Sequence, residues 1–194
     1  MSLQSNAAAS AEVHASRLAL PSTEFQITPI VRADLPALVD LHDRVFGPGR
    51  YARTAYRVRE HAPALSVACR KLVRDGATVG ASQMTWVQVS DVEGMLLGPL
   101  CVVPAYENRG LGQALVEACR DAAVSAGAAF VMLVGDLAYY QRCGFSRVPH
   151  GSIALPGPVD PARLLIWQAG DNSTVVKGLL AACPGDPHAT PRAR

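Results

Sequence analysis

The sequence predicts an α/β (α+β) fold, in which a mixed, mostly antiparallel twisted sheet of about six to seven strands is flanked by helices. Two β-rich runs joined across Arg74-Asp75-Gly76 indicate an antiparallel hairpin. An apolar run, an amphipathic helix and a second apolar run follow between residues 94 and 134, which is the pattern of a parallel βαβ unit. The apolar fraction of 49% and the charged fraction of 18% are typical of a globular domain.

One domain is the simplest organisation for a chain of 194 residues. We expect this domain to span residues 24–183. Residues 1–23 are rich in Ala and Ser without an apolar period, and residues 184–194 are rich in proline. Both ends are therefore expected to be flexible tails.

The first elements of the domain are a strand over residues 25–31 and a helix that follows it. Asp34 is a suitable N-cap for this helix, and the sequence Gly47-Pro48-Gly49 should end it. The apolar residues of the helix recur at spacings of three and four: Leu38, Leu41 and Val45.

A second helical stretch is expected from about residue 50 to residue 60. It is dense in hydrogen-bond donors, among them Arg50, Arg53, Tyr56 and Arg57. These side chains suit either a solvated helix face or a wall of a substrate site, and the pattern alone leaves both readings open.

The central part of the chain should supply the hairpin and the βαβ unit. The hairpin strands are expected over 65–73 and 77–89. The parallel unit should consist of a strand over 94–103, a helix over 110–126 and a strand over 128–134, with a right-handed crossover.

The last elements follow Val134. Asp136 is a good N-cap and Gly144 a good C′ residue for a short helix of two turns. Strands are then expected over 145–148 and 163–167. We expect the second of these to be an exposed edge strand, which could pair with a second copy of the chain in a homodimer.

The start of the helix at residue 110 carries two glycines, Gly110 and Gly112. Free N–H groups and the positive end of the helix dipole suit an anion there, although the same glycines could serve tight packing alone. Two other phosphate motifs are excluded. The sequence "GATVGAS" lacks the spacing and the lysine of a P-loop, and "GLGQAL" lacks the third glycine of a dinucleotide fingerprint.

Pro99 interrupts the apolar strand over 94–103. Since proline cannot donate a hydrogen bond to a ladder, it belongs at a sheet edge or at a bulge. A bend there would separate the strand from its parallel neighbour and leave the backbone of Cys101 to Val103 unpaired. A ligand that is itself an extended amide chain with a pyrophosphate could pair with this backbone and reach the helix start.

Two stretches, "LGPLCVVPAYENRGLGQALV" and "VGDLAYYQRCGF", resemble the two core motifs of the GNAT superfamily of acetyl-CoA-dependent N-acetyltransferases. The similarity extends in element order over about residues 25–168 and is specific mainly over 94–148. The resemblance implies a GNAT-like sheet with strands 4 and 5 parallel and splayed, and acetyl-CoA as cosubstrate.

The resemblance also implies the cosubstrate-binding residues. In this family the pantetheine arm lies between the splayed strands, and the pyrophosphate lies on the loop before the helix. The matching residues are Cys101, Val102 and Val103 beside the pantetheine. The residues matching the pyrophosphate loop are Asn108, Arg109, Gly110, Leu111, Gly112 and Gln113.

Glu107 departs from the family pattern, which usually has Gln or Arg at this position. A glutamate of ordinary pKa, about 4.3, is ionised at neutral pH and would repel a phosphate. We therefore expect Glu107 to turn outward or to pair with Arg109.

Thioester aminolysis requires a proton donor for the departing thiolate. The resemblance implies Tyr140, four residues before Gly144, as this general acid. The alternative is that Tyr139 and Tyr140 only pack the short helix, and a register error of one residue would exchange the two.

The general base is less clear. Glu93 is a candidate, with a simple surface carboxylate as the alternative, and loss of the proton to water would require no dedicated residue. Cys101 could suggest a covalent route, but no histidine is positioned in the sequence to activate it, so a small strand residue is the better interpretation.

Charge and composition exclude several other functions. A net charge of +2 is too small for a nucleic-acid or anionic-membrane footprint. No secretory signal or transmembrane run is present, so a cytoplasmic location is expected. The five scattered cysteines suit reduced core thiols, and no metal-binding motif occurs.

The sequence therefore predicts an N-acetyltransferase that moves an acetyl group from acetyl-CoA to a primary amine in a ternary complex. The acceptor could be a small molecule or a peptide. Two rival interpretations are a non-catalytic acyl-CoA-binding module of the same fold and an interaction domain without a cofactor.

Overall fold

The computed structural model describes most of the predicted domain, namely residues 24–47, 49, 54–60, 62–63, 65–170 and 176–184. The predicted tails lie outside the described residues, apart from residue 184. Arg50 and Arg53, which belong to the donor-rich stretch, also lie outside them.

The described residues form nine strands. They are β1 (Phe25–Pro29), β2 (Arg70–Arg74), β3 (Ala77–Val89), β4 (Val92–Val102), β5 (Phe130–Val134), β6 (Ser146–Arg147), β7 (Ile153–Ala154), β8 (Leu164–Gln168) and β9 (Gly178–Ala182). The α-helices are α1 (Leu35–Phe46), α2 (Thr54–Arg59), α3 (Leu111–Ser125) and α4 (Leu137–Tyr140). Short 3-10 segments are η1 (Arg32–Asp34), η3 (Pro104–Tyr106), η4 (Gln141–Cys143) and η5 (Pro161–Arg163).

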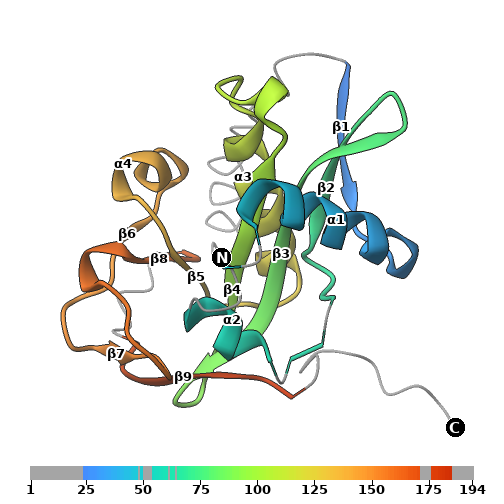
Figure 1. Ribbon diagram of the computed structural model, residues 1–194. Coiled ribbons are helices and arrows are strands. Elements are labelled where there is room, and N and C mark those ends of the chain that lie inside the picture. The colour runs from blue at the N-terminus through green and yellow to red at the C-terminus, as the bar shows by residue number, and fades with distance from the viewer. Residues whose placement is uncertain are drawn as a thin grey trace, which may run out of the picture.

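The strands build a mixed sheet in the order β1-β2-β3-β4-β5-β8-β6, to which β9 is added by pairing with β3 and β7. The predicted fold class is confirmed, because β4 and β5 are parallel and the other neighbours along the main path are antiparallel. The short strands β7 and β9 were not predicted, and they also pair in parallel. Helices α1 and α2 cross one face of the sheet, while α3 packs on the other (Figure 1).

The hairpin between β2 and β3 is confirmed. Asp75 and Gly76 both have positive φ angles, 49° and 79°, as a tight two-residue hairpin turn requires. The first hairpin strand begins at Arg70, however, and not at residue 65 as predicted. The reason is a turn before it, in which the amide of Cys69 donates to the carbonyl of Ser66 at 3.2 Å.

Asp34 precedes α1 as predicted, but it does not cap the helix with its side chain. Its carboxylate instead accepts from the Val31 amide at 2.8 Å and from the Lys71 ammonium. Gly47 ends α1 with a φ of 68°, as predicted. The carboxylate therefore stabilises the turn that leads into the helix and joins it to β2.

The prediction that residues 163–167 form an exposed edge strand is wrong. This segment is β8, which pairs with β5 along its whole length and with β6 on its other side. Since both neighbours are supplied by the same chain, the predicted pairing of this strand with a second copy loses its basis.

The core fills both faces of the sheet. All five cysteines are buried free thiols, in agreement with the prediction for reduced core residues. Gly94 of β4 is required by packing, because a Cβ atom there would lie 2.6 Å from the fully buried ring of Phe130 on β5. The Phe130 ring therefore packs directly against the backbone of β4, next to the first residue pair of the two strands.

Among the described residues, no helix combines the length and the apolar character that a membrane crossing needs.

Candidate active site

Strands β4 and β5 are paired over a very short distance. Met95 pairs with Val131 and Leu96 with Met132, and no further pair joins the two described strands. From Leu97 onward β4 continues beside β3, whereas β5 turns away toward β8. The predicted separation of the two parallel strands is therefore present, and it begins before Pro99.

The bend at Pro99 is a β-bulge. Ser82 of β3 pairs with Leu100, and Met84 pairs with Leu97, so Gln83 alone faces the two residues Gly98 and Pro99. A bulge tolerates a residue without an N–H group and increases the local twist of the strand. The predicted position of Pro99 at a bulge is confirmed.

The bulge also decides which backbone groups face the opening. The Val103 amide donates to the Val79 carbonyl at 2.8 Å, so the backbone N–H of Val103 points toward β3. Backbone groups alternate in direction along a strand, so those of Cys101, which pairs with Ala81, point toward β3 as well. The backbone of Leu100 and Val102 then faces the open edge. We predicted an unpaired backbone from Cys101 to Val103. The prediction holds for Val102, but it is wrong for Cys101 and Val103, and Leu100 is the second residue whose backbone faces the open edge.

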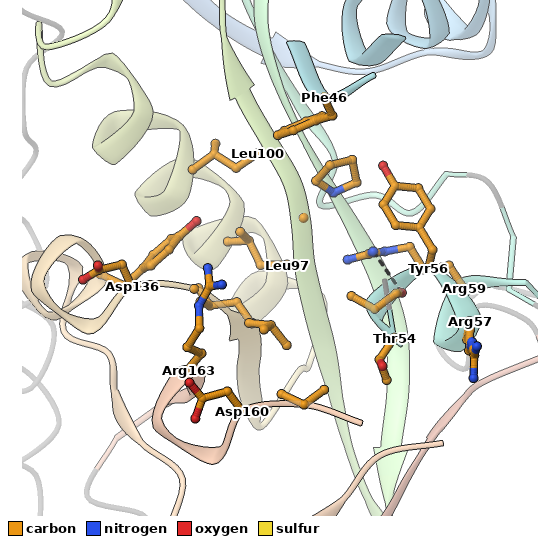
Figure 2. A pocket seen from close by; sticks show the side chains of 18 of the residues that line it. Phe46, Thr54, Tyr56, Arg57, Arg59, Leu97, Leu100, Asp136, Asp160 and Arg163 are labelled. Atoms are coloured by element: carbon orange, nitrogen blue, oxygen red, sulfur yellow. Dashed lines mark hydrogen bonds between the residues drawn. The ribbon is translucent and has the colours of Figure 1, made fainter. Parts of the chain in front are cut away.

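A cavity of about 590 Å³ occupies the space between the separated strands. Its floor is formed by Leu97–Leu100 of β4, by Leu133 and Val134 of β5, and by Gly135, which follows β5. Its walls come from the end of α1, from α2, from Tyr140 and from residues 158–160 and 163 (Figure 2).

Helix α2 forms one wall of this cavity. The Thr54 hydroxyl donates to the Pro158 carbonyl at 2.7 Å and so joins α2 to the loop on the opposite wall. Tyr56 and Arg57 line the cavity, which favours the substrate-wall interpretation of this donor-rich stretch over the solvated face.

Tyr140 lines the cavity at the end of α4, whereas Tyr139 does not. Asp136 caps α4 as predicted, accepting from the Ala138 amide at 2.7 Å. The Tyr140 ring packs edge-on against Phe145 and lies against Gly135, where β5 ends. The hydrogen bonds formed within the described part of the chain do not include the Tyr140 hydroxyl, which leaves this group available to a ligand.

Burial raises the pKa of Tyr140 above that of an ordinary phenol, with smaller contributions from Tyr139 and Cys143, while the nearby charge of Arg163 opposes the shift. Tyr140 is therefore a protonated hydrogen-bond donor at neutral pH. Burial likewise raises the pKa of Tyr139 to about 12. The Tyr139 hydroxyl lies against Gly112, so this residue packs α4 onto the start of α3.

The start of α3 has the geometry of an anion site. Asn108 and Gly110 have φ angles of 60° and 74°, and helical structure begins at Leu111. The Leu111 side chain is buried against the core, so this residue can offer only its backbone to a ligand. A Cβ at Gly110 would meet open space, whereas one at Gly112 would overlap Tyr139 and approach Val102. The helix start therefore adjoins the open edge of β4.

Glu107 is exposed, and it precedes this helix start with its side chain outside the cavity. Arg109 places its guanidinium over the ring of Tyr106, 5.7 Å from the ring centroid. Of the two arrangements that we expected for Glu107, the outward orientation therefore agrees with the structure.

Glu93 lies near the beginning of β4, four residues before the first cavity residue on this strand, and it does not line the cavity. Its charge acts on Cys183 of the core, whose pKa is raised mainly by burial. The structure therefore does not bring Glu93 and Tyr140 together. Cys101 is also unsuited to a covalent route, since burial raises its pKa to about 11 and keeps the thiol protonated.

Two cavity residues, Arg59 and Arg163, were not predicted. Figure 2 shows Arg59 reaching in from α2 and Arg163 from the opposite wall, on either side of Leu97. The three-residue spacing of Tyr56 and Arg59 on one helix was a signal for Arg59. No local pattern points to Arg163, which reaches the cavity only because β8 lies beside β5.

The described residues include no cluster of three or more His, Cys, Asp or Glu side chains that could hold a metal ion.

Comparison with known proteins agrees with this geometry. The acetyltransferase (GNAT) domain model matches residues 67–147. The Escherichia coli protein YhbS, named an uncharacterized N-acetyltransferase, is 26% identical over 142 residues, which are 72% of this chain and 84% of YhbS. The crystal structure of E. coli YhbS in complex with CoA superposes with a TM-score of 0.71 at 24% identity and covers 84% of this chain and 92% of that one. A Brucella melitensis GNAT acetyltransferase in complex with acetyl-CoA has a TM-score of 0.53 at 24% identity, covering 75% and 96% of the two chains.

The splayed sheet and the domain match indicate the same class of protein: residues 67–147 match the acetyltransferase (GNAT) domain, and the fold is GNAT-like. The E. coli protein YhbS resembles this chain in both sequence and structure.

Proposed function

We propose that this domain transfers an acetyl group from acetyl-CoA to a primary amine by direct attack in a ternary complex. The observation that carries the proposal is the short pairing of β4 and β5, which leaves a cavity with an open strand edge beside Tyr140. When bound, acetyl-CoA supplies an activated acyl group as a thioester.

The residues along the open edge fit this cosubstrate. The backbone of Leu100 and Val102 can pair with an extended amide chain, and this edge leads to Gly112 at the start of α3. Free amides there can bind a pyrophosphate, supported by the helix dipole and by the side chains of Asn108, Arg109 and Gln113. Cys101 and Val103 contribute packing and shape rather than backbone hydrogen bonds.

Tyr140 is the proposed general acid, which holds a proton for the departing thiolate. Its raised pKa and its position in the cavity wall support this role. No base is required if the acceptor binds as a free amine or loses its proton to water. The positive charges of Arg59 and Arg163 favour this route, because nearby cations disfavour the ammonium form and lower the pKa of a bound amine. A base role for Glu93 would need an acceptor that extends beyond the cavity.

A thermal-shift titration with CoA and acetyl-CoA tests the binding half of the proposal. A ligand present at 100 times its Kd should raise the free energy of unfolding by about 2.7 kcal/mol. Unchanged thermal stability at millimolar acetyl-CoA would support a domain without a cosubstrate.

Transfer of labelled acetyl groups to a panel of amines tests the catalytic half. We expect product with at least one class of amine. Stabilisation by acetyl-CoA without transfer to any acceptor would instead support the non-catalytic acyl-CoA-binding module.

Replacement of Glu107 with glutamine should leave the affinity for acetyl-CoA equal or improve it by up to about fivefold, because it removes a negative charge near the proposed phosphate site. Calorimetric titration measures this affinity. Asp91→Asn, which removes an exposed carboxylate at the opposite end of the sheet, is the matched control. A loss of affinity in Glu107→Gln beyond that of the control would mean that binding needs the carboxylate itself.

A further inference from the structure

Arg59 places a positive charge in the wall of the cavity. Arg59 is half-buried in the cavity wall, and burial lowers its pKa to about 10, so it is still charged at neutral pH. One terminal nitrogen, Nη1, donates to the Ala55 carbonyl at 3.0 Å, and the guanidinium lies over the Tyr56 ring. Its Nε is buried and has no hydrogen-bond partner among the described residues.

No carboxylate of the described residues forms an ion pair with this guanidinium. A buried charge is costly unless it is paired and hydrogen-bonded, and removing its partner leaves that cost unopposed. The remaining donors of Arg59 therefore suit a partner that is not part of the folded chain.

The position of Arg59 indicates where such a partner would lie. A Cβ on Gly98 would be 3.4 Å from Nη2 of Arg59, so this nitrogen adjoins the bulge where β4 leaves β5. The guanidinium is thus next to the floor of the cavity and not at its rim (Figure 2).

The rest of the cavity does not neutralise this charge. Asp136 and Asp160 line it and accept backbone hydrogen bonds at 2.7 Å and 2.9 Å, but neither forms an ion pair with Arg59, and the arginines of the lining outnumber these two carboxylates. Arg163 adds a second positive charge from the opposite wall, close enough to Tyr140 to act on its phenol. The lining of the cavity therefore carries more arginines than carboxylates, with Arg59 and Arg163 on either side of Leu97.

We propose that the acceptor is a small amine that also carries a carboxylate or phosphate group, and that Arg59 binds this anionic group with Arg163 as the second cationic contact. This inference rests on the proposed function for the reaction itself. The planar fork of donors on an arginine matches either anion, and the arrangement would direct the amine of a short acceptor toward Tyr140.

The first experiment compares matched acceptors with acetyl-CoA as donor. The probes are glycine, β-alanine and 4-aminobutyrate, the aminoalkylphosphonates of the same lengths, and the corresponding amino carboxamides. We expect kcat/KM for the best anionic probe to exceed that of its carboxamide by roughly tenfold or more, mainly through KM. The two anionic series distinguish carboxylate from phosphate recognition.

The second experiment asks whether Arg59 carries this preference. Arg59→Gln should reduce the preference for the anionic probe to less than about threefold, whereas Arg59→Lys should keep part of it as a point charge. Arg44→Gln, on an exposed arginine of α1 outside the cavity, is the control and should behave as the unmodified protein. If Arg59→Gln does not fold, the preference for the anionic probe over its carboxamide is measured in Arg163→Gln and in Arg59→Lys instead.

Binding of the best anionic probe, measured by calorimetry without acetyl-CoA, separates this inference from the proposed reaction. Binding that Arg59→Gln weakens about tenfold supports the anion site even if no transfer occurs. Transfer that is equally fast or faster with the carboxamides would overturn the inference and leave the acetyltransferase proposal intact. Anion binding that is unaffected by both arginine substitutions would overturn it as well.

Discussion

Replacement of Tyr140 with phenylalanine should lower kcat by roughly 10²- to 10⁴-fold, the range that general acid–base groups contribute, while the Kd for acetyl-CoA changes little. The substitution removes only the hydroxyl and keeps the ring that packs on Phe145 and Gly135. Single-turnover kinetics together with calorimetric titration of acetyl-CoA measure the two quantities separately.

Tyr139→Phe is the comparison variant, because it removes the neighbouring hydroxyl, which lies against Gly112 and outside the cavity. We expect a much smaller change in kcat for it. A larger loss in Tyr139→Phe than in Tyr140→Phe would exchange the roles of the two residues.

The pH dependence of kcat provides an independent test of Tyr140 as the general acid. Since burial raises the pKa of Tyr140, the phenol stays protonated below its raised pKa and the acid is lost only above it. At saturating substrates, Tyr140 should therefore cause no fall in kcat below about pH 10, the pKa of an ordinary tyrosine. A fall between pH 8 and 9 that disappears in Tyr140→Phe would contradict this expectation.

Substitution of Gly135 with alanine should also reduce kcat, by at least about tenfold, because a 1 Å misplacement of a catalytic group can be this costly. A Cβ at this position would overlap the Tyr140 ring and lie 2.8 Å from Leu133, so the ring must leave its present position in the cavity wall. We expect a loss of about 1–3 kcal/mol in the free energy of unfolding from the overpacking.

A double-mutant cycle distinguishes displacement of Tyr140 from general damage to the site. In a Tyr140→Phe background, Gly135→Ala should still destabilise the fold but should hardly lower kcat further, because the acid is already absent. Gly49→Ala, where a Cβ meets open space, is the control for adding a methyl group. Additive losses of kcat in the cycle would show that Gly135 acts independently of Tyr140.

Local patterns predicted the elements that build the scaffold of the site. The amphipathic period and the glycines located α3 within one residue at each end, the Asp-Gly pair located the β2–β3 turn, and Pro99 marked the bulge. In each case the signal comes from the backbone preferences of residues that are adjacent in the chain.

Predictions that depended on distant neighbours were less accurate. β8 was expected at an edge, yet it lies between β5 and β6, and β9 pairs with residues of β3 that are more than 90 positions earlier in the chain. Strand order depends on which strands bury their faces together, and a short apolar run has no local mark of its neighbours.

The sequence by itself determined the parallel unit, the bulge at Pro99 and the glycine-rich start of α3, because these depend on periodicity and on the φ preferences of proline and glycine. Only the tertiary structure decided that Leu100 and Val102 turn their backbone to the opening, since the bulge reverses the alternation of β4. It also decided that Arg59 and Arg163, about one hundred residues apart, share one cavity, because the packing of α2 and the position of β8 bring them there and no local pattern encodes that contact.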